Sequence, residues 1–184
     1  MPAAIVKVRE SSSDLMTRLS LEFLVLTAAR SSEVRLATWS EVDLITGTWI
    51  IPAARMKARR EHRVPLSRRA REILLEVQQG NNQGSEQETG LVFPGGIRGG
   101  SLSNMTHIQV LRRLEIPAVP HGFRSSFRDW VMEQTDTPWV VGEAALAHNL
   151  GNSTEMAYAR TDLFDKRREL MEAWDCFLDR DSSC

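Results

Sequence analysis

The sequence predicts a mainly α-helical protein with a small antiparallel β-sheet, an α+β fold. Apolar residues recur at helical spacing through most of the chain, and two short apolar runs lie close enough together to pair as a hairpin. The 184 residues are enough for one well-filled domain and too few for two ordinary ones. With 42% hydrophobic and 26% charged residues, the composition excludes a disordered or fibrous chain.

A buried helix over residues 14–29 is the first predicted element. Its apolar side chains lie near helical spacing and follow a polar run, residues 11–13, that can cap the helix. These side chains are Leu15, Leu19, Phe23 and Leu26. A shorter helix is expected over residues 32–38.

A β-hairpin is expected next in the chain. Residues 48–51 and 63–66 can pair as its two strands, with residues 53–61 at the tip. Pro65 has no N–H to give to a further strand, so its strand should lie at the edge of the sheet. Ser67 can cap the helix that follows. The apolar residues of that helix are Ile73, Leu74 and Val77.

The second half of the chain is expected to be mostly helical. Residues 80–90 should form a surface loop, and residues 91–93 are a candidate third strand. Helices are predicted over residues 103–114, 122–134, 138–147, 154–159 and 162–178. Thr137 is the expected cap of the third of these helices, with Pro138 in its first turn.

Charge is distributed unevenly, although the net charge is only −1. Residues 55–71 hold eight basic side chains and a single acidic one, Glu61. The basic residues are Arg55, Lys57, Arg59, Arg60, Arg63, Arg68, Arg69 and Arg71. Such a segment on an otherwise acidic chain is typical of a local anion-binding surface. A solvated charge run without a partner is the alternative.

Several other classes of protein are excluded. The apolar run 23–26 is far too short to cross a membrane, and residues 1–13 lack the parts of a signal peptide, so we expect a cytoplasmic protein. Cys176 and Cys184 give neither a disulfide framework nor a zinc-binding spacing. No metal site and no cofactor are expected.

A few residues could form an anion-binding or catalytic site. His121 and Arg124 are three residues apart in a predicted helix, so they share a face. Arg30 lies between two predicted helices, where its guanidinium could reach an anion while Glu33 orients its neighbours. Tyr158 is the only tyrosine, and an isolated tyrosine is more often a packing residue than a nucleophile.

The order of these residues is more informative than any one of them. Thr-x-x-Arg-x-x-Glu at 27–33, a lysine in a hairpin, His-x-x-Arg, Leu-x-His and a tyrosine ten residues later together resemble the catalytic domain of the tyrosine recombinases over residues 14–178. Finer phrases are similar to the prophage and genomic-island integrase branch. These phrases are IPAARMKARREHRVPLS, HGFRSSFRDW, LAHNLGNSTEMAYARTD and KRRELMEAW.

The resemblance implies a set of catalytic residues. They are Arg30, Lys57, His121, Arg124 and His148 around a scissile DNA phosphate, with Tyr158 as the nucleophile. Planar, permanently charged arginines suit the charge that develops on the phosphate oxygens. A phenol with a pKa of about 10 needs a proton acceptor, for which either histidine would serve. Lys57 is the candidate general acid for the leaving 5′-oxygen, and the implied product is a 3′-phosphotyrosyl link.

Supporting residues and partners follow from the same resemblance. Glu33 is expected to support the site without facing the phosphate, and Arg55, Arg59, Arg60 and Arg63 are expected to contact the DNA backbone. The implied partners are double-stranded DNA with attachment sites and further copies of the chain in a DNA-bound homotetramer, with a monomer in isolation. Accessory proteins that bend DNA or set the direction of the reaction are also implied.

Two departures from the family pattern are visible. Ala28 and Ala29 stand where many relatives have a glycine before the arginine, which alters the turn slightly. Full-length relatives also carry a core-binding domain, and often an arm-binding domain, that this chain lacks. We therefore expect a fragment or truncated gene product with weak DNA binding in isolation. Its parts are residues 1–13 as a tail or linker remnant, 14–178 as the catalytic domain and 179–184 as a C-terminal tail.

Other interpretations of the sequence remain open. A topoisomerase-like DNA-relaxing activity would use the same chemistry, a catalytically silent DNA-binding remnant would keep only the basic surface, and a helical interaction domain would use neither. The last predicted helix could dock on a neighbouring subunit or pack within its own chain. Its apolar residues include Leu170, Trp174 and Phe177.

Overall fold

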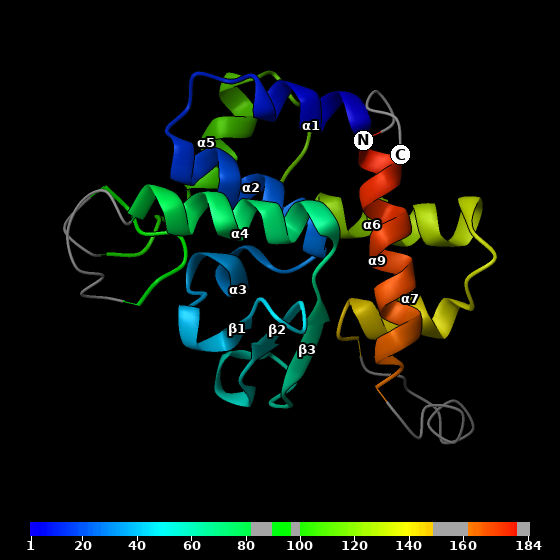
Figure 1. Ribbon diagram of the computed structural model, residues 1–184. Helices are drawn as coiled ribbons and strands as arrows, with labels where there is room; N and C mark the ends of the chain where they lie inside the picture. Colours follow the sequence, from blue (N-terminus) through cyan, green and yellow to red (C-terminus); the bar gives the residue numbers. More distant parts are fainter. Residues whose placement is uncertain (82–89, 97–99, 149–161, 180–184) are drawn as a thin grey trace.

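Figure 1 shows the computed structural model of the chain, which describes residues 1–81, 90–96, 100–148 and 162–179. Most of the elements are helices, and a small antiparallel sheet lies at one edge of the molecule (Figure 1), which confirms the predicted fold class. The helices are α1 (Pro2–Arg9), α2 (Leu15–Thr27), α3 (Ser31–Arg35), α4 (Arg68–Asn81), α5 (Thr106–Arg113), α6 (Gly122–Gln134), α7 (Trp139–Ala145) and α9 (Phe164–Leu178). Short 3₁₀ turns are formed by Trp39–Glu41 and Ala53–Arg55. Within the described residues, no helix is long and apolar enough to cross a membrane.

The sheet has three strands in the order β1 (Val42–Asp43), β2 (Thr48–Ile51) and β3 (His62–Pro65). Trp49 of β2 pairs with Val64 of β3, as the predicted hairpin requires. The strand that contains Pro65 lies at the edge, because a proline there leaves no ladder hydrogen bond unmade.

The third strand is not the predicted segment 91–93. Leu91 forms only an isolated bridge with Thr38, and β1 lies beside β2 instead. The Asp43 carboxylate starts the turn after β1 by accepting the backbone N–H groups of Ile45 at 2.9 Å and Thr46 at 3.1 Å. Gly47 continues the turn with a φ of +61°, a conformation that favours glycine. Local turn chemistry therefore decides which segment joins the sheet.

Helix α2 lies at the centre of the core. The nine residues from Leu19 to Thr27 are all buried, because α1, α3, α4, α5 and α9 pack against this helix. Asp14 caps its start by accepting the Thr17 N–H at 3.2 Å. The end of α2, which leads into the turn with Arg30, is thus held from several sides.

The apolar face of α9 packs within the chain. Trp174 is fully buried and donates its indole N–H to the Val25 carbonyl at 2.9 Å. Its ring centroid lies 5.3 Å from that of Phe127 and 4.9 Å from that of Trp130, and Phe177 stacks on it at 5.4 Å. Of the two alternatives for this helix, the structure shows intramolecular packing against α2 and α6.

Residues 1–13 were predicted to be a tail or linker remnant, and the first part of this segment is instead a helix. Pro2–Arg9 form α1, and Ile5 and Val8 on this helix are buried against α2. Residues three positions apart share a helical face, so this apolar pair is enough to fix α1 on the core.

An ion-pair network fastens α1 and α4 to the rest of the fold. The buried Glu22 carboxylate of α2 accepts Arg9 Nε at 2.8 Å and Arg69 Nε at 2.9 Å. Arg9 also reaches Asp179 at 2.6 Å, so α1 and the end of α9 lie together (Figure 1). Asp179, the first residue of the expected tail 179–184, is therefore part of the fold, while the rest of that segment lies outside the described residues.

The helix predicted over residues 122–134 has the same ends in the structure, and those predicted over 103–114, 138–147 and 162–178 are present with shifted ends. Pro138 is extended, with a ψ of 131°, and is itself the N-cap of α7, so Thr137 does not cap this helix. The Thr137 N–H donates to the Thr135 hydroxyl at 3.2 Å instead. The helix expected over residues 154–159 lies outside the described residues.

Candidate active site

The turn between α2 and α3 holds Arg30 by its backbone and by its side chain. Ala28 ends α2 in the left-handed conformation with a φ of 48°, and Arg30 is the N-cap of α3. Glu33 accepts the Arg30 backbone N–H with Oε2 and the Arg30 Nη1 with Oε1, both at 2.7 Å. This buried carboxylate fixes the direction of a guanidinium that remains 25% exposed.

Arg124 on α6 is almost fully buried and bridges two segments of the chain. Its Nη1 donates to the Ala28 carbonyl, and its Nη2 donates to the Leu146 carbonyl at 2.6 Å. Its buried Nε has no hydrogen-bond partner among the described residues. Burial, followed by the nearby charge of Arg30, lowers the pKa of Arg124 to about 10. The group therefore keeps its charge at neutral pH and has N–H donors left for an anion.

The end of α7 brings His148 to the same guanidinium. Ala147 is left-handed with a φ of 51°, and the His148 N–H donates to the Glu143 carbonyl at 3.0 Å, as in a Schellman motif. His148 Nδ1 lies 2.8 Å from the Glu143 carboxylate, and Nε2 lies 3.4 Å from Arg124 Nη2. Because a carboxylate only accepts and a guanidinium only donates, Nδ1 carries the hydrogen and Nε2 presents its lone pair.

Sequence reasoning missed Glu143. This residue is 8% exposed and shares its carboxylate between His148 and Arg128, whose Nε lies at 2.7 Å. An acidic residue five positions before a candidate histidine, near the end of a predicted helix, is the signal that could have found it. Glu143 fixes both the orientation and the tautomer of the imidazole.

His62 at the start of β3 is the second residue that sequence reasoning missed. Its ring makes a hydrogen bond with the backbone of Ala145, so it joins the hairpin to α7. Burial, followed by the charge of Arg167, lowers the pKa of His62 to about 4, so the ring is neutral at pH 7. His62 is one of four histidines in the chain, and nothing in the sequence around it indicates that its ring is buried.

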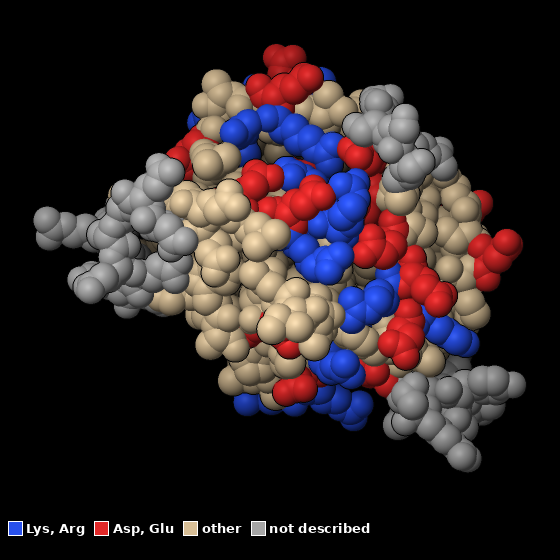
Figure 2. Space-filling model, viewed as in Figure 1, with Lys and Arg blue, Asp and Glu red and all other residues tan. Residues whose placement is uncertain are grey.

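The tip of the hairpin between β2 and β3 is exposed and basic. The side chains of Lys57, Arg59 and Arg60 make no hydrogen bond or ion pair with another described residue. Basic side chains gather at the lower edge of the molecule in Figure 2, where Figure 1 places this tip. The buried Met56 anchors the loop in the core. Lys57 therefore extends with a free amine from an anchored loop.

Arg55 points inward and binds within the fold, while its predicted role as a DNA contact stays a prediction. Its guanidinium binds both carboxylate oxygens of Glu41 and the backbone carbonyl of Glu33. The side chain is only 20% exposed, so few of its donors are left for a DNA backbone. The same contacts tie the hairpin with Lys57 to the residue that orients Arg30.

Ion pairs neutralise much of the rest of the basic segment. Arg63 lies 3.1 Å from the Asp162 carboxylate and 4.0 Å above the Phe164 ring, although 43% of its side chain stays exposed. The ion pairs on α4 include Arg68–Glu72, Arg69–Glu22 and Arg69–Glu76. Figure 2 shows acidic and basic side chains interleaved over α4 and α9. The basic side chains of residues 55–71 without an ion pair to a described residue are therefore the three at the hairpin tip and Arg71, which is exposed on α4.

Three of the predicted catalytic residues are not joined to the arginines by a described contact, and the first is Lys57 on the hairpin tip. His121 is the N-cap of α6, and its exposed side chain makes no hydrogen bond with a described residue. Tyr158 lies outside the described residues. Arg30, Glu33, Arg124 and His148 are the predicted site residues that the structure brings together.

This arrangement can bind an oxyanion and accept a proton beside it. Arg124 binds the carbonyl of Ala28 in the turn that carries Arg30, both guanidiniums have donors to spare, and the His148 imidazole presents a lone pair to Arg124. In the described part of the chain, no group of three or more histidine, cysteine or acidic side chains could hold a metal ion.

Comparisons with known proteins agree on one family. Residues 2–163 match the model of the Phage integrase family. The prophage integrase IntA of Escherichia coli K12 is 35% identical over 177 residues, covering 95% of this chain and 41% of that protein. The integrase of Enterobacteria phage P4 is 31% identical over 196 residues, covering 97% of this chain and 44% of that protein. The chain thus spans less than half the length of these relatives.

Solved structures show the same fold. The integrase from mycobacterium phage Brujita matches with a TM-score of 0.71 at 20% identity, over 96% of this chain and 57% of that one. The XerA recombinase matches with a TM-score of 0.62 at 16% identity, over 91% of this chain and 60% of that one. Identities this low establish the fold alone.

Proposed function

The chain belongs to the phage integrase family, and on that basis we propose that it cleaves and rejoins DNA strands in site-specific recombination. Tyr158 Oη attacks the scissile phosphorus, the bond from phosphorus to the 5′-oxygen breaks, and a 3′-phosphotyrosyl link forms. The phenol loses its proton and the leaving 5′-oxygen gains one. A 5′-hydroxyl of a second strand then attacks the link and releases Tyr158.

The observation that carries this proposal is that Arg124 binds the Ala28 carbonyl, in the turn that presents Arg30. After burial, the charge of Arg30 lowers the pKa of Arg124, so the two positive charges repel each other in the folded chain. A phosphate that accepts hydrogen bonds from both relieves that repulsion, and the effect grows as charge develops on its oxygens in the transition state. In this proposal the two arginines meet that charge without a metal ion.

His148 is the proton acceptor in this mechanism. We call Arg30, Glu33, Arg124, Glu143 and His148 the arginine cluster. Within it, the Nε2 lone pair of His148 faces Arg124. Glu143 accepts the hydrogen on Nδ1 and stabilises the imidazolium that forms when Nε2 takes the phenol proton. His121 has no described partner that fixes its tautomer, and we assign it a hydrogen bond to a phosphate oxygen.

Lys57 is the general acid, because its ammonium can give a proton to the leaving 5′-oxygen. Arg59 and Arg60 lie beside it on the same exposed tip and would contact neighbouring phosphates, which positions DNA without specifying its sequence. The partly exposed Arg63 would add a weaker contact of the same kind, since Asp162 already neutralises it.

The proposed setting is duplex DNA with two attachment sites, bound by a homotetramer in the cytoplasm. Accessory DNA-bending or directionality proteins complete this assembly, and the chain is monomeric without DNA. The relatives are more than twice as long as the segment that this chain matches. The regions outside that segment are expected to increase the affinity for DNA.

Covalent capture tests the proposed function. The chain is incubated with nicked duplexes that span the ends of its own mobile element, and a denaturation-resistant adduct is sought. The adduct should form with the wild type and with Arg113→Ala, which removes an exposed arginine from α5. It should be lost in Tyr158→Phe and in Arg124→Ala.

The other outcomes distinguish the remaining interpretations. Salt-sensitive DNA binding without an adduct, even when the chain is joined to the regions that its relatives hold beyond the matched segment, would favour a catalytically silent remnant. Relaxation of supercoiled plasmids that lack attachment sites would favour a topoisomerase-like activity.

A further inference from the structure

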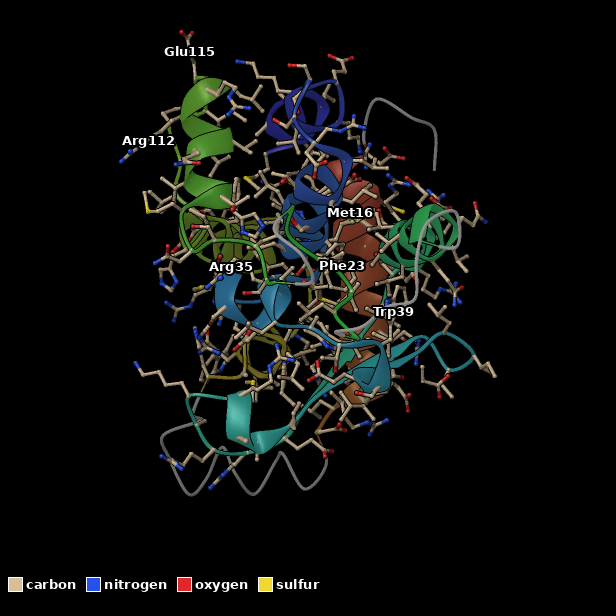
Figure 3. The ribbon with its side chains drawn as sticks, turned by 90° about the vertical axis from the view of Figure 1, so that its left-hand side faces the viewer. Met16, Phe23, Arg35, Trp39, Arg112 and Glu115 are labelled. Atoms are coloured by element: carbon tan, nitrogen blue, oxygen red, sulfur yellow. The ribbon has the colours of Figure 1, made fainter. Side chains whose placement is uncertain are left out.

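His107 of α5 bridges the two helices that flank the turn carrying Arg30. Its side chain is fully buried. Its Nε2 lies 3.0 Å from Ser20 Oγ in α2, and its Nδ1 lies 3.1 Å from Ser31 Oγ at the start of α3. Figure 3 shows α5 and α2 side by side above α3, which bears the labelled Arg35. One ring thus contacts both sides of the turn.

The hydrogen bonds of Ser20 determine the tautomer of His107. Ser20 Oγ donates its one hydrogen to the Thr17 carbonyl at 2.9 Å, so toward the ring it can only accept. Nε2 therefore carries the ring hydrogen, and Nδ1 accepts from the Ser31 hydroxyl. An ordered chain of hydrogen bonds runs from α3 through the ring to α2.

Burial keeps this ring in the form that the two serines require. Burial, followed by the charge of Arg35, lowers the pKa of His107 to about 4. A neutral imidazole has one donor and one acceptor, whereas an imidazolium has two donors and would not accept from Ser31. The bridge is therefore complete at neutral pH.

We propose that His107 is a positioning residue for Arg30. Arg30 stands directly before Ser31, and Arg124 holds the Ala28 carbonyl at the other end of the turn. The ring sets the spacing of α2 and α3 and thereby the place that the Arg30 guanidinium occupies. The importance of that place for DNA cleavage rests on the proposed function, but the placement itself can be tested without DNA.

The first test uses the full chain in solution. Ser31→Ala removes the donor to Nδ1, and Ser32→Ala, which alters the exposed neighbouring serine, is the matched control. Long-range ¹H–¹⁵N spectra should show His107 protonated at Nε2 at pH 7. The Arg30 Nε–H signal, identified by its loss in Arg30→Lys, should shift in Ser31→Ala and stay unchanged in Ser32→Ala. A ring protonated at Nδ1, or an Arg30 signal that does not move in Ser31→Ala, would overturn the proposal.

The second test measures the rate of covalent adduct formation at saturating nicked DNA. Ser31→Ala should slow the reaction about 10- to 100-fold, because a displaced donor loses transition-state stabilisation. The Kd for DNA should change little, and Ser32→Ala should behave as the wild type. In an Arg30→Ala background, Ser31→Ala should have almost no further effect.

Equal slowing in both backgrounds would show that Ser31 acts independently of Arg30, which refutes the positioning role. If the wild type forms no adduct at all, the proposed function has failed, and the spectra still decide whether His107 places Arg30.

Discussion

The arginine cluster, whose side chains are held by hydrogen bonds, and the exposed hairpin tip present positive charge in opposite ways. In the cluster, a carboxylate holds Arg30 and two backbone carbonyls hold Arg124. At the tip, Lys57, Arg59 and Arg60 have no partner among the described residues. Donors that must meet developing charge benefit from fixed positions, because no reorganisation is then needed during the reaction. Side chains that contact a DNA backbone can be ordered by the DNA itself.

This difference separates the expected effects of substitutions. In the cluster, each side chain satisfies buried groups of the fold, so a change should affect stability and chemistry together. At the tip, a change should affect DNA binding or proton transfer and leave stability intact. The predictions below test this separation.

Arg124→Ala should have the largest effect on both properties. It leaves the Ala28 and Leu146 carbonyls without their donor, at a cost of about 1–3 kcal/mol for each buried group. It should also slow adduct formation about 10³-fold through the lost transition-state donor. Urea unfolding and the rate of covalent capture measure the two effects. An Arg124→Ala chain of wild-type stability would contradict the structural half of this comparison.

Lys57→Ala should slow DNA cleavage about 10²-fold or more, as expected for loss of a general acid. The free energy of unfolding should change by less than about 0.5 kcal/mol, because the side chain has no described partner. A substrate with a 5′-thiol leaving group, which needs little help from an acid, should restore cleavage by this variant. The same substrate should not rescue Arg124→Ala, and rescue of both would argue against the assigned roles.

Acid should weaken the fold through the buried histidines. Burial lowers the pKa of both His62 and His107 to about 4, below the ordinary value of 6.5. Between pH 6.5 and 4 the unfolded chain therefore binds more protons than the folded chain, so stability falls as the pH falls. Each histidine should contribute up to about 1.4 kcal/mol per pH unit in this window.

Urea unfolding between pH 7.5 and 4.5 measures this dependence. His62→Gln should flatten the curve, whereas Lys57→Gln at the hairpin tip should leave its slope unchanged. An unaltered slope in His62→Gln would show that this ring is not buried as described.

Arg55 and the pair Arg59 and Arg60 give the finest comparison, since all three lie in the same basic segment. The double variant Arg59→Ala/Arg60→Ala should make the negative slope of log K against log salt for DNA binding shallower by about two units, with unchanged stability. Arg55→Ala should leave that slope unchanged and lower stability by about 1–3 kcal/mol, because Glu41 loses its ion-pair partner and the Glu33 carbonyl loses a donor. The reverse pattern would restore Arg55 as a DNA contact.

Local signals in the sequence predicted most of the fold. Pro65 identified an edge strand, and Ser67 does cap α4 by accepting the Ala70 N–H at 3.4 Å. The missed elements carry weak local signals: α1 has one apolar pair, and β1 is two residues long. Both are stabilised by contacts with distant segments, which sequence periodicity does not report.

The order of the site residues along the chain was predictable from the sequence, but the contacts between their side chains were not. Family-like spacing led to Arg30, Glu33, Arg124 and His148, which the structure brings together. The inward turn of Arg55 depends on Glu41, fourteen positions away on another element. Such pairing follows from the packed fold, so charge counting alone places too many of the basic residues on the surface.

The contact between Arg124 and the Ala28 carbonyl also bears on the synthesis of the chain. It joins residues 96 positions apart, and contacts that close long loops form later than local ones. A chain still emerging from the ribosome can complete α2, α3 and the hairpin while α6 has yet to be made. Such an intermediate has the basic tip but not the paired guanidiniums. The paired guanidiniums that the proposed cleavage uses are therefore complete only after α6 has been made.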